Sequence, residues 1–232
     1  MVKVEYLLYA RFQGHRFRRI NICIRTVCIV TGQEYPVAVN TDSQPRVIKV
    51  WDPLIRSFHW LLLLSFVIAY GAIRSGMQEL HIISGYVLAG LLVIRGIWGV
   101  IGSTHARFVN FVYRPQTVMH YLRSILQGRP ERHLGHNPAG GMMVIGLLLF
   151  LFAVVSSGLV ISAAIEFEGP LLGLFAGLSD AWAYRLADFH RLAVDVIWFM
   201  VLLHVAGVLL ASIQHRENLV LSMFSGHKKC AE

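Results

Sequence analysis

The chain has 232 residues, of which 56% are hydrophobic and only 15% are charged, and this composition is typical of a membrane protein rather than a soluble domain. Four segments reach the ~20 mostly apolar residues that a helix needs to cross a bilayer. They lie at 54–73, 81–101, 141–165 and 189–213. These segments are too many and too central to be a cleaved signal peptide, so the sequence predicts an all-α membrane protein with a bundle of four transmembrane helices.

The formal net charge of +8 does not require a nucleic-acid partner, because the basic residues are unevenly distributed. Lys and Arg number nine before Ser57, five in 102–140 and three after Ile213, whereas the other two connections hold one each. By the positive-inside rule, both termini and the middle connection are cytoplasmic and the two poor connections face outward. The partner that this pattern predicts is membrane lipid.

Residues 1–45 mix short apolar runs with a basic cluster at 15–19 and lack a sustained helical or strand period. We expect a cytoplasmic extension with little fixed structure, or sequence upstream of the true start, followed by the transmembrane domain at 46–232. A segment lying on the membrane surface is the alternative. The cysteines Cys23, Cys28 and Cys230 all fall on the predicted cytoplasmic side, so no structural disulfide is expected. There is also no CxxCH motif for covalent haem attachment.

The first span follows Asp52-Pro53, a helix-start signal, because proline is tolerated in the first turn. Its histidine, His59, lies 14 residues before the outer end at Ile73. A helix rises ~1.5 Å per residue, so His59 is predicted ~21 Å below the outer edge of the membrane.

The second span begins after a short turn with His81 at the outer boundary. Arg95 lies 14 residues further on, which places it on the face of His81 and at the depth of His59. We expect Arg95 to pair with the propionates of a haem at that depth, with snorkelling to the cytoplasmic headgroups as the alternative. Gly85 and Gly90 leave backbone surface against which a flat macrocycle could lie, unless they serve close helix packing.

The connection 102–140 contains an amphipathic run and several histidines in a polar, basic segment, which we interpret as surface residues. They are His105, His120, His133 and His136. The third span has neither charge nor histidine, and the small residues at 156–158 indicate a helix that packs rather than ligates. The connection 166–188 is net acidic and suits a basic soluble partner.

The fourth span carries His190 near its outer end and His204 well inside, 14 residues apart. This spacing returns to within ~40° of the same helix face after a rise of ~21 Å. Ionisable side chains within a span are functional candidates, and imidazole is a common haem ligand. In the same helix, Arg191 and Asp195 are spaced to neutralise each other.

The four histidines of the spans fall at two predicted depths in the membrane. His81 and His190 lie at one depth (the outer pair), and His59 and His204 lie at the other (the inner pair). Zinc would need additional Cys or carboxylate ligands at the same depth. Two histidines filling both axial positions of a haem iron leave no site for oxygen or substrate, which favours electron transfer. The sequence therefore predicts two noncovalent haems, each held by two histidines.

Four stretches carry a family resemblance: VWDPLIRSFHW, RGIWGVIGSTHARF, GRPERHLGHNPAGG and LHVAGVLLASIQHRENLVLSMFSGHKK. On these, residues 47–229 resemble the bacterial cytochrome b561-type family of dihaem membrane cytochromes, which includes the b-type subunit of nickel-iron hydrogenases. The resemblance implies haem b on the same two histidine pairs and a location in the bacterial inner membrane. It also implies exchange of electrons between the quinone pool and a redox partner, such as a c-type cytochrome, hydrogenase or dehydrogenase subunit.

Two functional hypotheses follow. The first is an electron-transfer cytochrome of a respiratory chain, without a substrate site or catalytic residues of its own. The alternative is a stand-alone superoxide:quinone-type oxidoreductase. A transporter or a haem-free anchor would leave the matching depths of the histidines as a coincidence.

Overall fold

A computed structural model of the chain describes residues 22–24, 27–30, 33–36 and 47–229, and the chain divides into two units. In the first unit, strands β1 (Ile22–Ile24), β2 (Val27–Val30) and β3 (Gln33–Pro36) form an antiparallel sheet in that order. These strands occur where the sequence showed no sustained strand period. The rest of 1–45 lies outside the described residues, so the expectation of a cytoplasmic extension stays a prediction. Strand β4 (Val47–Lys49) leads into the second unit, Lys49–Lys229.

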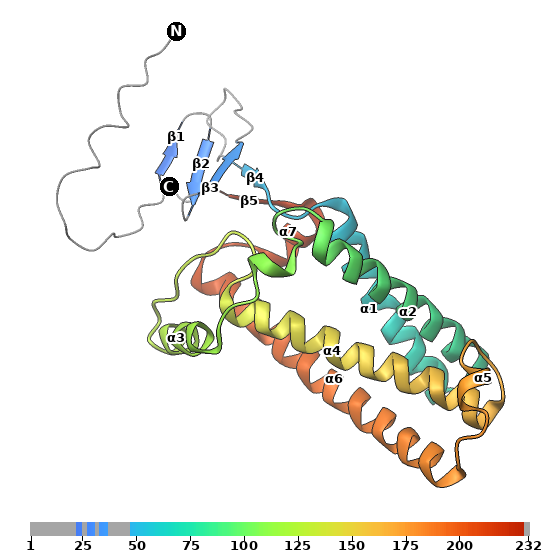
Figure 1. Cartoon of the computed structure of the whole chain (residues 1–232). Helices are drawn as coiled ribbons and strands as arrows, with labels where there is room; N and C mark the ends of the chain where they lie inside the picture. The colour runs from blue at the N-terminus through green and yellow to red at the C-terminus, as the bar shows by residue number, and fades with distance from the viewer. Residues whose placement is uncertain (1–21, 25–26, 31–32, 37–46, 230–232) are drawn as a thin grey trace. The chain divides into compact units, whose positions relative to one another are not determined.

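The second unit is built on four long helices (Figure 1), as the sequence predicts. They are α1 (Pro53–Arg74), α2 (Gln78–Ile101), α4 (Pro138–Ile161) and α6 (Asp180–Gln214). A π-helical turn, η2 (Ser162–Glu166), extends α4 at its C-terminal end. Each of these helices is long and apolar enough to cross a membrane. Helix α1 packs along α2 and α4 packs along α6, and the two pairs meet through α2 and α4.

Side chains at helix starts explain where α1 and α4 begin. The Asp52 carboxylate accepts a hydrogen bond from Ile55 N at 2.9 Å, and Asn137 Oδ1 accepts one from Gly140 N at 2.7 Å, each just before a proline in the first turn. Asp52 also accepts from Trp98 Nε1 at 3.2 Å and from Ser103 Oγ. Burial raises the pKa of Asp52, but these hydrogen bonds together bring it below its usual value.

The fourth helix is longer than predicted, because it begins at Asp180 rather than near Phe189. The nine residues before the apolar span, DAWAYRLAD, contain no helix breaker, and Asp180 suits the positive end of the helix dipole. Hydrophobicity locates the part of a helix that suits the bilayer, not the part that continues beyond it. The connection between η2 and α6 is correspondingly shorter and contains only the short helix α5 (Leu172–Phe175).

The C-terminal segment returns to the start of α1. After α7 (Leu219–Ser225), Gly226 O accepts hydrogen bonds from Val50 N at 2.8 Å and Trp51 N at 3.1 Å, and β5 (His227–Lys229) follows. Gly226 has φ 82°, and a Cβ on it would lie 2.8 Å from Trp51 O, so only glycine suits this position. Trp60 stacks on Phe224 with ring centroids 4.3 Å apart. The end of the chain is therefore fastened to its first span.

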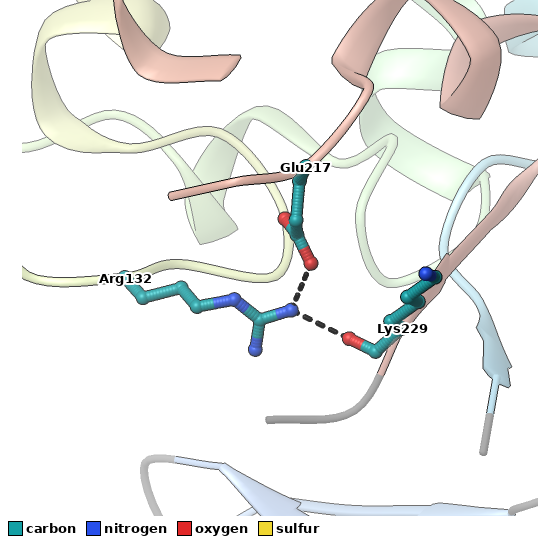
Figure 2. Close-up of polar contacts among 3 residues, drawn as sticks. All are labelled: Arg132, Glu217 and Lys229. Carbon is teal, nitrogen blue, oxygen red and sulfur yellow. Dashed lines mark hydrogen bonds and ion pairs between the residues drawn. The ribbon is translucent and has the colours of Figure 1, made fainter. Parts of the chain in front are cut away.

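The middle connection covers the same end of the bundle with η1 (Phe108–Asn110) and α3 (Pro115–Leu126). Figure 2 shows how it is joined to the C-terminal segment: Arg132 forms an ion pair with Glu217 and donates a second hydrogen bond to the backbone oxygen of Lys229. Both side chains of the ion pair are mostly buried, which shields the pair from solvent.

The buried core of the bundle is a layer to which all four long helices contribute. It consists of Phe66, Ala69, Leu88, Leu151, Val154, Ala193 and Ile197. Along α6, Ala193 and Ile197 lie between His190 and His204, and along α1 and α2 the core residues lie between the histidine and the opposite helix end. The packed layer thus separates the two predicted ligand depths.

Candidate functional site

The structure brings the inner pair together at one end of the bundle. His59 on α1 and His204 on α6 face each other with ring centroids 6.5 Å apart and ring planes at 49°. Both side chains are partly buried, and His59 Nδ1 is a buried nitrogen with no hydrogen-bond partner. The two rings come from helices far apart in the sequence, as the depth argument required.

The outer pair meets in the same way. His81 on α2 and His190 on α6 have ring centroids 6.3 Å apart and ring planes at 75°. His81 Nδ1 lies 2.9 Å from Ala69 O, a backbone carbonyl of α1. That oxygen can only accept, so His81 Nδ1 carries the proton and Nε2 keeps its lone pair.

Ser157 of α4 fixes the other ring of the outer pair. Its hydroxyl donates to Val154 O at 2.9 Å and lies 3.0 Å from His190 Nδ1. Because the hydroxyl proton is already used, His190 Nδ1 donates to Ser157 Oγ, and Nε2 is left as an electron-pair donor. Ser157 is only 3% exposed. The sequence analysis treated Ser157 as a packing residue, so the structure adds it to the site.

The geometry of both pairs fits haem. A metal ion bonded at ~2 Å to one nitrogen of each ring would hold the ring centres roughly 6 Å apart. Within the described residues, no group of three or more His, Cys, Asp or Glu side chains could hold a metal ion. A Cβ built on Gly85 or Gly90 would meet no atom within 4 Å. No neighbouring helix therefore packs closely against α2 at these two glycines.

Arg95 is buried, at 4% exposed, where α2 approaches the middle connection. Its Nη2 donates to Ala106 O at 3.0 Å, and the guanidinium carbon lies 4.5 Å from the ring centroid of Phe108. Its Nη1 is buried and has no hydrogen-bond partner. Arg95 is therefore enclosed by the protein rather than exposed at its surface. A guanidinium with one free buried donor fits a carboxylate ligand.

Three histidines of the middle connection are not the surface residues that the sequence suggested. His120 is exposed, but His105 and His136 are partly buried beside Trp51, with ring centroids 6.3 Å and 4.8 Å from it. His133 is partly buried beside Tyr121, with ring centroids 5.5 Å apart. His136 Nδ1 is buried and unpaired. Burial, followed by the nearby charges of Lys228 and Arg95, lowers the pKa of His136 to about 3.

Lys228 is a second buried cation that the sequence analysis did not single out. It is 8% exposed, and its Nζ lies 5.9 Å from the ring centroid of Trp51. Burial lowers the pKa of Lys228 to about 8; Glu217 acts to raise it and Arg132 lowers it further. The family resemblance was the one sequence signal that could have pointed to His136 and Lys228, because the matching stretches include GHNPAGG and SGHKK, which lie outside the four apolar segments.

The predicted neutralisation of Arg191 by Asp195 is wrong. Arg191 pairs with Asp188, one turn earlier on α6, and both side chains are exposed. The extension of α6 back to Asp180 explains the difference, because it places Asp188 on a helical turn three residues before Arg191.

Comparison with known proteins agrees with this arrangement. A family model described as "Prokaryotic cytochrome b561" matches residues 50–226. Similar proteins are each named as a probable Ni/Fe-hydrogenase B-type cytochrome subunit. The protein of Bradyrhizobium diazoefficiens is 27% identical over 164 residues, which are 64% of this chain and 65% of that protein. The protein of Azotobacter vinelandii is 28% identical over 230 residues (80% of this chain and 92% of that protein). The protein of Cupriavidus necator is 22% identical over 225 residues (82% of this chain and 91% of that protein). No solved structure matches the chain.

The four apolar helices and the two facing histidine pairs define a multi-pass membrane protein with paired imidazole sites. The chain belongs to the prokaryotic cytochrome b561 family, whose model covers more than half of it. Bound haem b and electron transport in a bacterial membrane follow from this membership.

Proposed function

We propose that the chain is a dihaem b-type cytochrome that transfers electrons between the quinone pool and a redox partner. One haem b is held by the inner pair, His59 and His204, and the other by the outer pair, His81 and His190. The observation that carries the proposal is the facing of imidazoles at two depths, with centroids 6.5 Å and 6.3 Å apart. An ion pair or a packing role would not require both pairs to match in depth and spacing.

Different residues of the chain orient the histidines at the outer site and bind a propionate at the inner site. Ala69 O and Ser157 Oγ hold the Nδ1 atoms of the outer pair and thereby aim Nε2 of each ring at the space between them. Arg95 offers its free Nη1 to a propionate at the inner site. Haem b, when bound, would supply one-electron redox chemistry, and two histidines holding its iron would leave no site there for a substrate.

The packed layer between the sites excludes water from the middle of the bundle. Ile197 and Ala193 on α6 are 1% and 2% exposed, and Leu88 on α2 is 3% exposed. Along α6 the two ligands are 14 residues apart, which corresponds to ~21 Å of helix. This separation covers most of a hydrocarbon core of about 30 Å, so the two sites serve opposite sides of the membrane.

The distribution of basic residues supports the proposed orientation of the chain in the membrane, and the names of the similar proteins support the proposed redox partner. The basic middle connection and C-terminal segment support a cytoplasmic location of both termini and of the inner pair. The similar proteins are named as hydrogenase cytochrome subunits, which favours a subunit of a larger redox complex over a stand-alone superoxide:quinone oxidoreductase. A hydrogenase is accordingly the partner that we propose to test first, with a quinone as the second electron carrier.

The test is the haem content of purified full-length protein and of single histidine variants. Pyridine haemochrome analysis should give about two haems per chain in the wild type. His59→Ala and His204→Ala should each lose the inner haem, whereas His81→Ala and His190→Ala should each lose the outer one, as shown by potentiometric titration. His120→Ala, at an exposed histidine of α3, is the control and should keep both. A protein without haem, or loss of the same component from His59→Ala and His81→Ala, would refute the proposal.

A further inference from the structure

Three buried cationic or potentially cationic side chains gather at the end of the bundle that holds the inner pair. Arg95 comes from α2, His136 from the loop before α4, and Lys228 from β5. Arg95 and Lys228 are 4% and 8% exposed, and His136 Nδ1 is fully buried. Segments from the middle and the end of the chain thus converge on one place.

Two aromatic rings connect the three groups. The His136 ring lies 4.8 Å from Trp51 and 4.7 Å from Phe111, measured between centroids. Lys228 Nζ lies 5.9 Å from the Trp51 centroid, and the Arg95 guanidinium carbon lies 5.9 Å from the Phe111 centroid. Trp51 directly precedes α1, which carries His59 near its start, and Arg95 lies near the C-terminal end of the antiparallel α2, so the cluster lies at the end of the bundle that holds the inner pair.

The buried donors of this cluster are not met by the acids near it. Arg95 Nη1 and His136 Nδ1 are buried without a partner. The Asp52 carboxylate accepts from Ile55, Trp98 and Ser103, and Glu217 is paired with Arg132, so among the described residues these acids act on Arg95 and Lys228 through their charge without a hydrogen bond. Buried cations and donors of this kind are costly unless an anionic acceptor meets them. The arrangement is that of an anion site.

We propose that Arg95, His136 and Lys228 form a carboxylate-binding site for the propionate groups of the haem held by the inner pair. This inference rests on the proposed function and extends it beyond Arg95 to residues of the middle connection and the C-terminal segment. The guanidinium offers a free N–H, the ammonium offers three, and a neutral imidazole still donates one. A lipid phosphate is the other anion with matching chemistry, but the site is enclosed by Trp51 and Phe111, which are 7% and 2% exposed.

The C-terminal segment positions Lys228 in this site. Arg132 holds the segment through Glu217 and the backbone oxygen of Lys229 (Figure 2), and Gly226 O accepts from Val50 N and Trp51 N. Lys229 is exposed on the other side of the same strand. The neighbouring lysines therefore provide a matched pair, with one inside the proposed site and one outside it.

The test compares Lys228→Met and Lys229→Met in full-length holoprotein, purified in a maltoside detergent free of phosphate. Resonance Raman spectra, recorded at a potential where only one haem is reduced, report the propionate bending vibrations, and potentiometric titration gives both midpoints. Lys228→Met should shift the propionate vibration of the inner haem alone and lower its midpoint, because a nearby positive charge disfavours oxidised iron. Lys229→Met should match the wild type, and Lys228→Arg should restore both readouts.

Each other outcome has a distinct meaning. Two bound haems with unchanged vibrations in Lys228→Met would overturn the propionate site and leave the proposed function intact, whereas absence of haem from the wild type would overturn the proposed function. If Lys228→Met loses the inner haem, recovery in Lys228→Arg supports the charge role, and loss in both variants refutes it. An effect that appears only after phospholipid is added would assign the anion to a lipid phosphate and overturn the proposal.

Discussion

Ser157→Ala tests whether the hydroxyl of α4 fixes a haem ligand. The variant removes the hydroxyl acceptor of His190 Nδ1, 3.0 Å away, in a buried place, because Ser157 is 3% exposed, and leaves Val154 O as the other acceptor near that ring. Loss of such an outer partner of a metal-bound histidine typically lowers affinity 10–100-fold, or about 1.4–2.8 kcal/mol.

The affinity should fall only at the outer site. Transfer of haem from the full-length protein to an excess of a haem-scavenging apo-globin, followed by absorbance, should show one haem released 10–100-fold more readily and the other unchanged. The outer midpoint should also rise, because the ring loses the hydrogen bond that makes it a stronger donor to oxidised iron.

Ser84→Ala is the matched control for this variant. Ser84 is 5% exposed and lies three residues from His81 on α2, but its hydroxyl donates only to Leu80 O in the same helix. Both haems should behave as in the wild type. The reasoning fails if Ser157→Ala retains both haems with wild-type release rates, or if the inner haem is the one released.

Two further predictions concern the inner end and the N-terminal region. Arg95→Leu should lower the midpoint potential of the inner haem by tens of millivolts. This is the size expected for one charge acting over about 10–20 Å at an effective dielectric of about 20. An unchanged midpoint potential with the inner haem still bound would contradict a role at the propionates. Arg107→Leu, at an exposed arginine of the same connection, is its control in the titration. Deletion of residues 1–45 should leave haem content and membrane insertion unchanged, because the four spans and four histidines lie outside it; failure of the truncated chain to accumulate in membranes would show that the region is structural.

The sequence predicted the spans and the histidine pairs well, because both depend on local helix geometry. A fixed rise per residue and a short outer turn are enough to place His59 level with His204 and His81 level with His190. The facing rings at 6.5 Å and 6.3 Å confirm that the predicted partners meet. Their ligation of haem stays a prediction.

The remaining features depend on contacts between segments far apart in the chain. Nothing near Ser157 in the sequence shows that it meets His190, 33 residues later. In the sequence Lys228 is one of two ordinary C-terminal lysines, and only the fold brings it beside Trp51. His136 was interpreted as a surface residue because its polar neighbours dominate the local pattern. Burial of a loop is set by what folds over it, which no local period reports.

The two hydrogen bonds to Gly226 O have a consequence for biosynthesis. About 175 residues separate Val50 and Trp51 from Gly226 along the chain, so these bonds cannot form until nearly all of the second unit has been made. At translation rates of about 5–20 residues per second, Gly226 is synthesised roughly 10–35 s after Val50 and Trp51. A nascent chain that ends after His204 already contains every histidine of both pairs, yet the end that holds the inner pair still lacks Lys228 and the two hydrogen bonds to Gly226 O. That end is therefore the last part of the bundle to be completed as the protein leaves the ribosome.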